Sequence, residues 1–106
     1  MNLAQEYADL HRDTPKSQVA RRSRLETVGD ILRVIGAGAE KPTHIMYKAN
    51  LSWAVMQGYV SSLEDQGLVV TVSDQGKRLY HLTEKGFLLS SQFRTIRDEL
   101  DILDKS

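Results

Sequence analysis

Cysteine is absent from the 106 residues of this chain. Its absence excludes a disulfide framework, a thiolate zinc site and a thiol nucleophile, and it favours an intracellular location. The three histidines, His11, His44 and His81, are too scattered along the sequence to predict a metal site. We therefore expect a protein that works without a metal ion or a cofactor.

Long apolar runs are also missing. No stretch approaches the roughly 18 residues of a membrane span, and residues 1–13 lack the apolar block of a secretory signal. Nothing combines an activated nucleophile with a base, and no glycine-rich phosphate loop follows a strand. These absences predict a soluble, cytoplasmic protein that is not an enzyme.

Neither sign of charge is in excess, because 14 basic residues balance 14 acidic ones. The net charge therefore gives no support for a nucleic-acid partner, but the two ends of the chain differ. The front carries Arg12, Lys16, Arg21, Arg22 and Arg24 against Asp13, and the tail carries Asp98, Glu99, Asp101 and Asp104. This separation predicts different partners for the two ends.

Three helices are expected between residues 23 and 66. The first begins at a capping box formed by Ser23 and Glu26, and its apolar residues recur at helical spacing as far as Gly36. They are Leu25, Val28, Ile31, Leu32 and Ile35. Residues 1–22, which precede this helix, are expected to form a basic arm with at most one short helix.

The second and third helices follow at short spacing. Pro42 suits the start of a helix over residues 43–49, Asn50 can turn the chain, and Ser52 can cap the next helix. The apolar face of that third helix is expected to consist of Met56, Tyr59, Val60 and Leu63, with Gly67 as its exit. Two helices separated by so few residues are typical of a helix-turn-helix.

An extended pattern replaces the helical one after Gly67. Residues 68–72 and 77–82 are predicted strands, and residues 73–76 have the composition of a turn, so the segment is a hairpin. Three helices followed by a hairpin make a winged helix, an α+β fold that is mainly α. We expect this domain to span residues 23–83.

A fourth helix is expected to begin after Thr83 and to continue to about Asp104. Five of its apolar residues follow the 4, 3, 4, 3 spacing of a coiled-coil seam: Leu89, Phe93, Ile96, Leu100 and Leu103. Phe87 and Leu88 fall off this seam and are expected to pack on the domain. Residues 84–106 are thus predicted to form a homodimer, the alternative being one amphipathic helix folded on its own core.

The run over residues 41–86 resembles winged-helix transcriptional regulators, and residues 41–52 resemble one archaeal family in particular. The supporting motifs are Leu51-Ser52, Leu63 followed by Gly67-Leu68-Val69, and Leu82-Thr83-Glu84-Lys85-Gly86. Members of that family pair through a C-terminal coiled-coil helix and include gene regulators and small DNA-compacting proteins. The resemblance implies double-stranded DNA as a partner and a nucleoid-associated location.

The third helix of such folds enters the major groove with its N-terminal half. Ser52, Trp53 and Gln57 are then expected to point outward, although the helix carries no lysine or arginine on that face. Gln57 is the best candidate for reading a base, because its amide can pair with adenine. Trp53 could press on a sugar or a thymine methyl, but a lone tryptophan more often packs against a neighbouring helix.

Phosphate contacts are expected around this helix, where they would position the motif without reading sequence. The candidates are Tyr47, Lys48 and Asn50 at the turn, Lys77 and Arg78 after the wing turn, and Arg21, Arg22 and Arg24 at the end of the arm. Ordinary solvated charge is the alternative for each group. The sequence therefore predicts a dimeric DNA-binding transcriptional regulator. The alternatives are a protein-protein interaction module and an architectural DNA-compacting protein without sequence preference.

Overall fold

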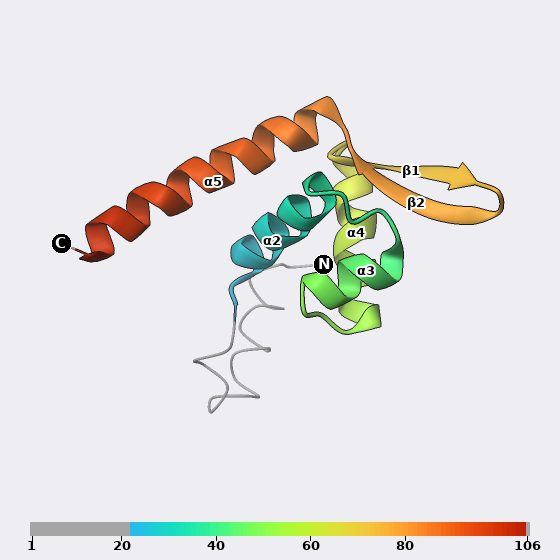
Figure 1. The fold of residues 1–106 in the computed structure, drawn as a ribbon, viewed down its shortest axis with the longest axis horizontal. Coiled ribbons are helices and arrows are strands. Elements are labelled where there is room, and N and C mark those ends of the chain that lie inside the picture. The colour runs from blue at the N-terminus through green and yellow to red at the C-terminus, as the bar shows by residue number, and fades with distance from the viewer. Residues whose placement is uncertain (1–21, 106) are drawn as a thin grey trace.

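The computed structural model describes residues 22–105, so the predicted arm lies outside the described residues except for Arg22. The elements are α2 (Arg24–Gly36), α3 (Pro42–Lys48), α4 (Trp53–Asp65), β1 (Val69–Asp74), β2 (Lys77–Leu82) and α5 (Glu84–Lys105). Three helices and a hairpin form one body, and α5 extends away from it as a long helix (Figure 1). The predicted winged-helix fold, mainly α with one hairpin, is confirmed. None of the helices described has the length and apolar content needed to cross a membrane.

The helix starts follow the predicted capping residues. The Ser23 hydroxyl accepts a hydrogen bond from the Glu26 amide at 3.0 Å, and the Glu26 carboxylate accepts one from the Ser23 amide at 3.2 Å. The Ser52 hydroxyl accepts from the Val55 amide at 3.3 Å. The second helix begins at Pro42, one residue earlier than predicted, because the missing amide proton of proline costs nothing in a first turn.

The turn of the wing, which is the hairpin of β1 and β2, is shorter than the sequence predicts. Ser73 and Asp74, expected in the turn, belong to β1, where they pair with Arg78 and Lys77 of the antiparallel strand β2. Only Gln75 and Gly76 remain in the turn, with φ angles of 51° and 79°. Positive φ at both positions defines a type I′ turn, whose twist matches that of the two strands.

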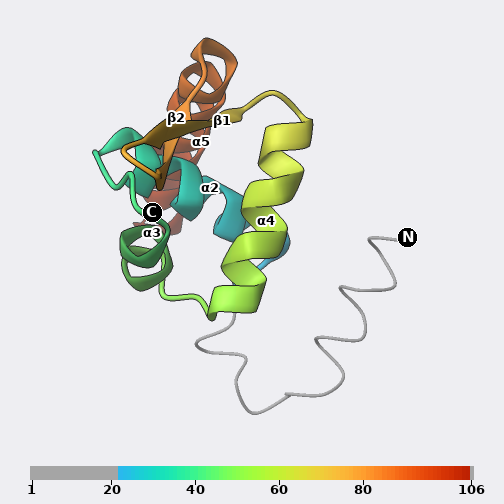
Figure 2. The same cartoon turned by 90° about the vertical axis from the view of Figure 1, so that its right-hand side faces the viewer.

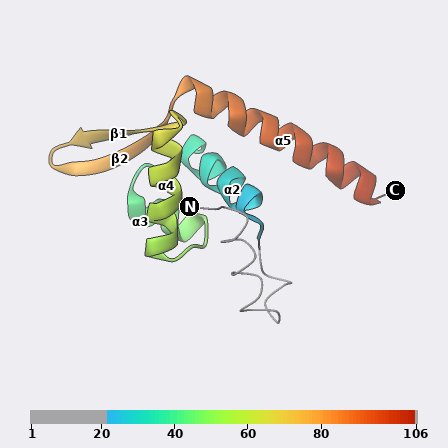
Figure 3. The same cartoon turned by 180° about the vertical axis from the view of Figure 1, so that it is seen from behind.

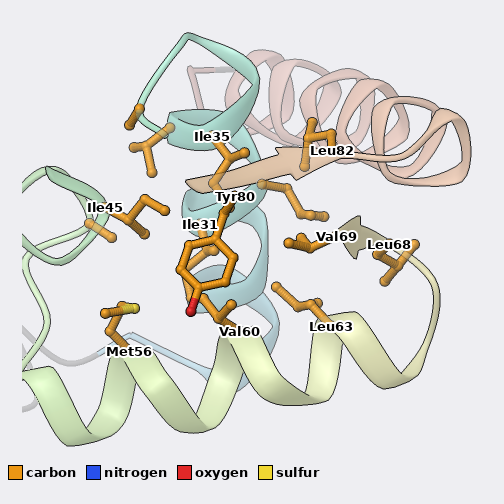
Figure 4. Packing of buried hydrophobic residues seen from close by; sticks show 14 residues of the cluster. Ile31, Ile35, Ile45, Met56, Val60, Leu63, Leu68, Val69, Tyr80 and Leu82 are labelled. Atoms are coloured by element: carbon orange, nitrogen blue, oxygen red, sulfur yellow. The ribbon is translucent and has the colours of Figure 1, made fainter. Parts of the chain in front are cut away.

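One apolar core joins the three helices to the hairpin, and Leu32, Met56 and Leu63 all belong to it, as predicted. Figure 4 shows the side chains of α2, α4 and β2 meeting in this cluster, including Ile31, Ile35, Val60, Tyr80 and Leu82. Leu25, expected on the apolar face of the first helix, is 66% exposed, so that prediction is wrong. Leu25 lies in the first turn of α2, beyond the reach of the core, whereas the later part of α2 also buries Val34 because it contacts α3, β2 and α5.

The start of α5 is fixed against the domain. The Thr83 hydroxyl accepts a hydrogen bond from the Gly86 amide at 3.0 Å, which caps the helix. A Cβ atom at position 86 would overlap the carbonyl oxygen of Leu68, so only glycine allows this close approach. The first turns of α5 are therefore held on the base of the hairpin.

The packing of the next turns of α5 corrects one prediction. Leu88, expected on the domain, is exposed, and Phe87 is also 56% exposed although the edge of its ring reaches Gly36 of α2, whereas Leu89 and Phe93 pack on the core. Phe93 lies against Gly29 of α2, where an added Cβ would come within 3.2 Å of the ring. The physical reason is the helical period: the capped start directs the stripe of Gly86, Leu89 and Phe93 inward, so Leu88 turns outward and Phe87 lies at the edge of the contact with α2.

A single carboxylate, that of Asp30, connects α2 with two other parts of the chain. It accepts hydrogen bonds from Arg22 at 2.8 Å and from Arg97 of α5 at 3.2 Å, and Arg33 lies 3.8 Å away. Arg22 also donates to the carbonyl of Asn50 at 3.0 Å. Asp30 therefore links α5, the entry to α2 and the turn between α3 and α4.

The environment of Asp30 changes its acidity. Burial raises the pKa of Asp30, but the hydrogen bonds from Arg22 and Arg97 and the charges of Arg22 and Arg33 lower it by more. The pKa of Asp30 consequently lies below its ordinary value. The ionised form is thus stabilised by the fold and stabilises the fold in return.

We expect Asp30→Asn to lower the free energy of unfolding at pH 7 by roughly 1 to 3 kcal/mol, because three guanidiniums lose the negative charge they share and one of its two acceptor oxygens becomes a donor. Since the folded pKa is depressed, this stabilisation is present above the unfolded pKa of about 3.9 and is lost as the pH falls through the folded pKa. Urea unfolding at pH 7 and near pH 2.5 should therefore show a penalty that shrinks in acid. A penalty of equal size at both pH values would contradict this account, and Asp65→Asn provides an exposed control.

Leu63→Ala is expected to lower the free energy of unfolding by roughly 2 to 5 kcal/mol, because it removes a buried side chain and leaves a cavity. Leu88→Ala shortens an exposed leucine and should change this energy by less than about 0.5 kcal/mol. Urea unfolding at one protein concentration measures both. A loss as small as that of the control would mean that Leu63 does not support the core.

Candidate nucleic-acid interface

The elements that carry most of the predicted contacts share one face of the domain. Figure 2 looks onto the side with α3, α4 and the hairpin, while α5 recedes behind them. In Figure 1 the tip of the wing and the C-terminal end of α5 lie at opposite ends of the molecule. The predicted contact residues between 47 and 78 therefore lie on elements that are separated from the free end of α5.

The outward face of α4 carries small, uncharged side chains over most of its length, with one exposed acidic residue, Asp65, at its C-terminal end. Met56, Val60 and Leu63 are buried, as predicted, and Tyr59 is half-buried against the same core. The opposite face presents Ala54, Gly58 and Ser61, all exposed, and Ser52 is exposed at the helix start. Side chains of this size allow another surface to come close to the helix backbone, but they add no charge to hold it there.

Gln57 and Trp53 lie on one flank of α4. Gln57 is half-buried, and Trp53 keeps 48% of its surface exposed, so the expectation that it packs against a neighbouring helix is only half met. Glu64 lies on the same helical stripe and accepts a hydrogen bond from the Thr71 hydroxyl of β1. This flank of α4 therefore faces the wing, and Gln57 is on the wing side of the small outward face.

The turn between α3 and α4 exposes a polar group of side chains. Asn50 adopts a φ of 56°, a left-handed conformation that asparagine tolerates better than most residues. Just before it, Tyr47 is 78% exposed and Lys48 is also exposed. Three of the predicted phosphate contacts thus stand on the surface at one turn.

The arginines at the end of the arm have partners inside the protein. Arg22 is bound to Asp30 and to the Asn50 carbonyl, and the guanidinium of Arg24 lies over the Tyr59 ring, 5.3 Å from its centroid. Arg21 lies outside the described residues. Sequence reasoning missed these internal roles because the partners lie on other turns and helices.

Lys77 and Arg78 stand exposed on the wing strand that follows the turn. A hydrogen bond to the Tyr80 hydroxyl, together with the nearby carboxylate of Glu64, raises the pKa of Arg78 above its ordinary value. Arg78 carries its charge at neutral pH in any case, so the effect of these contacts is to keep its guanidinium beside Tyr80 and Glu64. Tyr80 itself is buried and directs its ring toward α4 (Figure 4).

The close contact between α2 and α5 is a feature that sequence reasoning missed. Gly29 stands in the middle of a predicted helix, where glycine costs roughly 0.5 to 1 kcal/mol relative to alanine. Such a cost is a usable sign of close packing, and Phe93 indeed fills the space.

Within residues 22–105, no group of three or more histidine, aspartate or glutamate side chains is arranged to hold a metal ion.

Comparison with known proteins agrees with this architecture. Residues 21–101 match the winged helix-turn-helix family. A relative from Methanocaldococcus jannaschii, the uncharacterized protein MJ0287, is 35% identical over 82 residues, which is 77% of this chain and 80% of the relative. The family match over residues 21–101 thus covers the whole winged-helix domain that the structure describes and most of α5.

Two similar solved structures also come from archaea. Sso10a-2, a DNA-binding protein from Sulfolobus solfataricus, is 28% identical, with a TM-score of 0.63 over 79% of this chain and 90% of that one. A possible HxlR family transcriptional factor from Thermoplasma volcanium is 25% identical, with a TM-score of 0.65 over 80% of this chain and 84% of that one. From the match over residues 21–101 and the fold, this chain belongs to the winged helix-turn-helix family, and its relatives include archaeal proteins.

Proposed function

We propose that this protein is a dimeric transcriptional regulator that binds double-stranded DNA with α4 in the major groove and the wing on the backbone. The observation that carries the proposal is that α3, α4 and the hairpin lie on one side of the molecule with α5 behind them (Figure 2), and that Lys48, Lys77 and Arg78 on these elements are exposed. The similar structures described as a DNA-binding protein and as a possible transcriptional factor support it.

Phosphate contacts supply most of the affinity in this proposal. Lys48 approaches the backbone from the turn, and Lys77 and Arg78 approach it from the wing, with Tyr47 and Asn50 adding polar contacts. The helix dipole of α4 adds partial positive charge at its N-terminus, where Ser52 caps the first turn. Arg22 and Arg24 support these elements from inside through their internal partners.

Base reading is limited to a few side chains. Gln57 pairs with adenine in the major groove, and Trp53 contacts a sugar or a thymine methyl at the start of the helix. The small outward residues Ala54, Gly58 and Ser61 let α4 enter the groove deeply but distinguish few base pairs. This uncharged surface favours a second candidate function, architectural DNA binding without sequence preference, which a comparison of native with random duplexes separates from regulation.

Affinity for DNA should fall steeply with salt, because each phosphate contact releases counterions. With about three contacts per subunit, a dimer should give a log-log slope of roughly −5. Removing Lys77 and Arg78 together should weaken all duplexes about equally and flatten the slope. Fluorescence anisotropy with labelled duplexes at several salt concentrations measures both effects.

Gln57→Ala should leave this slope unchanged and alter only the preference among sequences, by about 1 to 3 kcal/mol. Lys85→Gln removes one positive charge from α5, where Lys85 donates to the carbonyl of Gln66, and serves as a charge control with an unchanged slope. No binding of duplex DNA even at low salt would contradict the proposal and would favour the protein-protein interaction module.

Dimerisation is assigned to the exposed part of the predicted seam on α5. Leu89 and Phe93 are half-buried against their own domain, whereas Ile96, Leu100 and Leu103 are exposed and have no core of their own to cover. Apolar side chains repeated along one helix face are typical of pairing with a second helix. The proposal therefore places the subunit contact beyond Phe93.

Leu100→Asp should convert the dimer to a monomer, because it buries a charge without a partner in the apolar seam. Leu88→Asp is the matched control: Leu88 is 62% exposed and Leu100 58%, but Leu88 lies off the apolar seam of α5 and should leave the dimer intact. Light scattering coupled to size exclusion measures the mass. Unaltered protein that is monomeric at micromolar concentration would contradict the dimer.

A further inference from the structure

Both strands of the wing approach one carboxylate of α4, that of Glu64. The hairpin projects from the C-terminal end of α4, on the side away from α5, as Figure 3 shows from behind. Glu64 lies in the last turn of α4 and accepts a hydrogen bond from the Thr71 hydroxyl of β1. Its negative charge also acts on Arg78 of β2. A polar contact therefore links the wing to the helix expected in the major groove.

The strand register explains why Arg78 comes near Glu64. Thr71 pairs with Tyr80 across the hairpin and Ser73 pairs with Arg78, so these four side chains share one face of the hairpin. The bond from Thr71 to Glu64 identifies this face as the one toward α4. The Arg78 guanidinium donates a hydrogen bond to the hydroxyl of Tyr80, whose ring is buried in the core. Arg78 is thus held by a core residue and attracted by Glu64.

Lys77 occupies the other face of the hairpin. Successive residues of a strand point to opposite faces, so Lys77 points away from α4 and lies across from Asp74 of β1. Lys77 and Arg78 are both exposed, but only Arg78 shares a face with the residue that Glu64 binds. The two neighbouring basic residues of the wing therefore differ in their relation to α4.

An exposed carboxylate at this place by itself opposes DNA binding, because it repels phosphates within the Debye length of about 8 Å. Arg78 changes this balance. A guanidinium has five N–H donors in a fixed fork, so its bond to Tyr80 and its attraction to Glu64 leave donors for a phosphate. A side chain that is already held also loses less conformational entropy when it binds.

We propose that Glu64 is a positioning residue for DNA binding: it holds the wing against α4 and directs the guanidinium of Arg78 toward the phosphate backbone. The inference rests on the proposed function, in which the wing contacts the backbone, and adds an acidic residue to the parts that make this contact. Glu64 does not touch the DNA and acts through Arg78. Removing its negative charge therefore weakens binding.

Glu64→Gln gives a result whose sign separates this proposal from charge repulsion alone. The variant keeps an acceptor for Thr71 but loses the charge that attracts Arg78. Loss of a repelling charge alone would strengthen binding, whereas we expect the dissociation constant for a labelled duplex to rise about three- to tenfold. Asp65→Asn removes the neighbouring exposed carboxylate of α4 and should leave binding unchanged or slightly tighter. Unchanged or tighter binding by Glu64→Gln would overturn the proposal.

A double-mutant cycle tests whether Glu64 acts through Arg78. In an Arg78→Gln background, Glu64→Gln should no longer weaken binding, because the guanidinium that it holds is gone. In a Lys77→Gln background, Glu64→Gln should weaken binding by the same factor as in the unaltered protein, since Lys77 lies on the other face of the hairpin. An equal effect of Glu64→Gln in all three backgrounds would overturn the proposal.

The orientation of the wing can be measured without DNA. Residual dipolar couplings of the amides in residues 69–82, compared with those of α4, should change in Glu64→Gln and stay the same in Asp65→Asn. Glu64 is exposed, so its variant should unfold within about 4 °C of the unaltered protein. Unchanged couplings in Glu64→Gln would overturn the proposal.

The outcomes separate this proposal from the proposed function. If the unaltered protein binds no duplex DNA, the proposed function fails and the positioning role fails with it, whatever the couplings show about the wing. If the unaltered protein binds duplex DNA and Glu64→Gln binds it as tightly or more tightly, DNA binding stands and only the positioning role of Glu64 fails.

Discussion

The contact between Phe93 and Gly29 determines how the rest of the molecule can be used. Glycine at position 29 lets the ring of Phe93 approach the backbone of α2, and the hydrogen bond from Arg97 to Asp30 holds the next turn of α5 nearby. Gly86 also packs closely against the Leu68 carbonyl, and these contacts together set the direction in which α5 leaves the domain. The exposed part of α5 is therefore presented in one orientation.

Charge is unevenly distributed in this chain without net charge. Lys48, Lys77 and Arg78 are exposed at the turn and on the wing, where Glu64 and Asp74 are exposed beside them, and four further acidic residues follow one another closely in the last turns of α5. Arg22 and Arg24, which add to the positive charge near the domain entry, are held by Asp30 and by the Tyr59 ring. Within the Debye length of about 8 Å at physiological ionic strength, a phosphate group senses the local charges and not the total.

Local chemistry was sufficient to predict most of the elements from the sequence. The capping box at Ser23, the cap at Ser52 and the proline at position 42 mark helix starts through bonds that form within one turn. The apolar period of α4 predicted its buried face correctly for Met56 and Leu63. The position of the wing was predicted correctly, but the predicted turn is too long, because pairing between the strands extends β1 to Asp74.

The sequence by itself determined the winged-helix order of elements, the helix caps, the core residues of α4 and the amphipathic character of α5, because these depend on neighbours within a few residues. Only the tertiary structure decided that Phe93 packs on Gly29 while Leu88 stays exposed, that Asp30 gathers Arg22, Arg33 and Arg97, and that Leu25 is left outside the core. A periodic apolar pattern predicts which residues share a face of a helix, but it does not predict which part of the protein that face points toward. That direction comes from contacts between segments far apart in the chain, which exist only once the helices have packed.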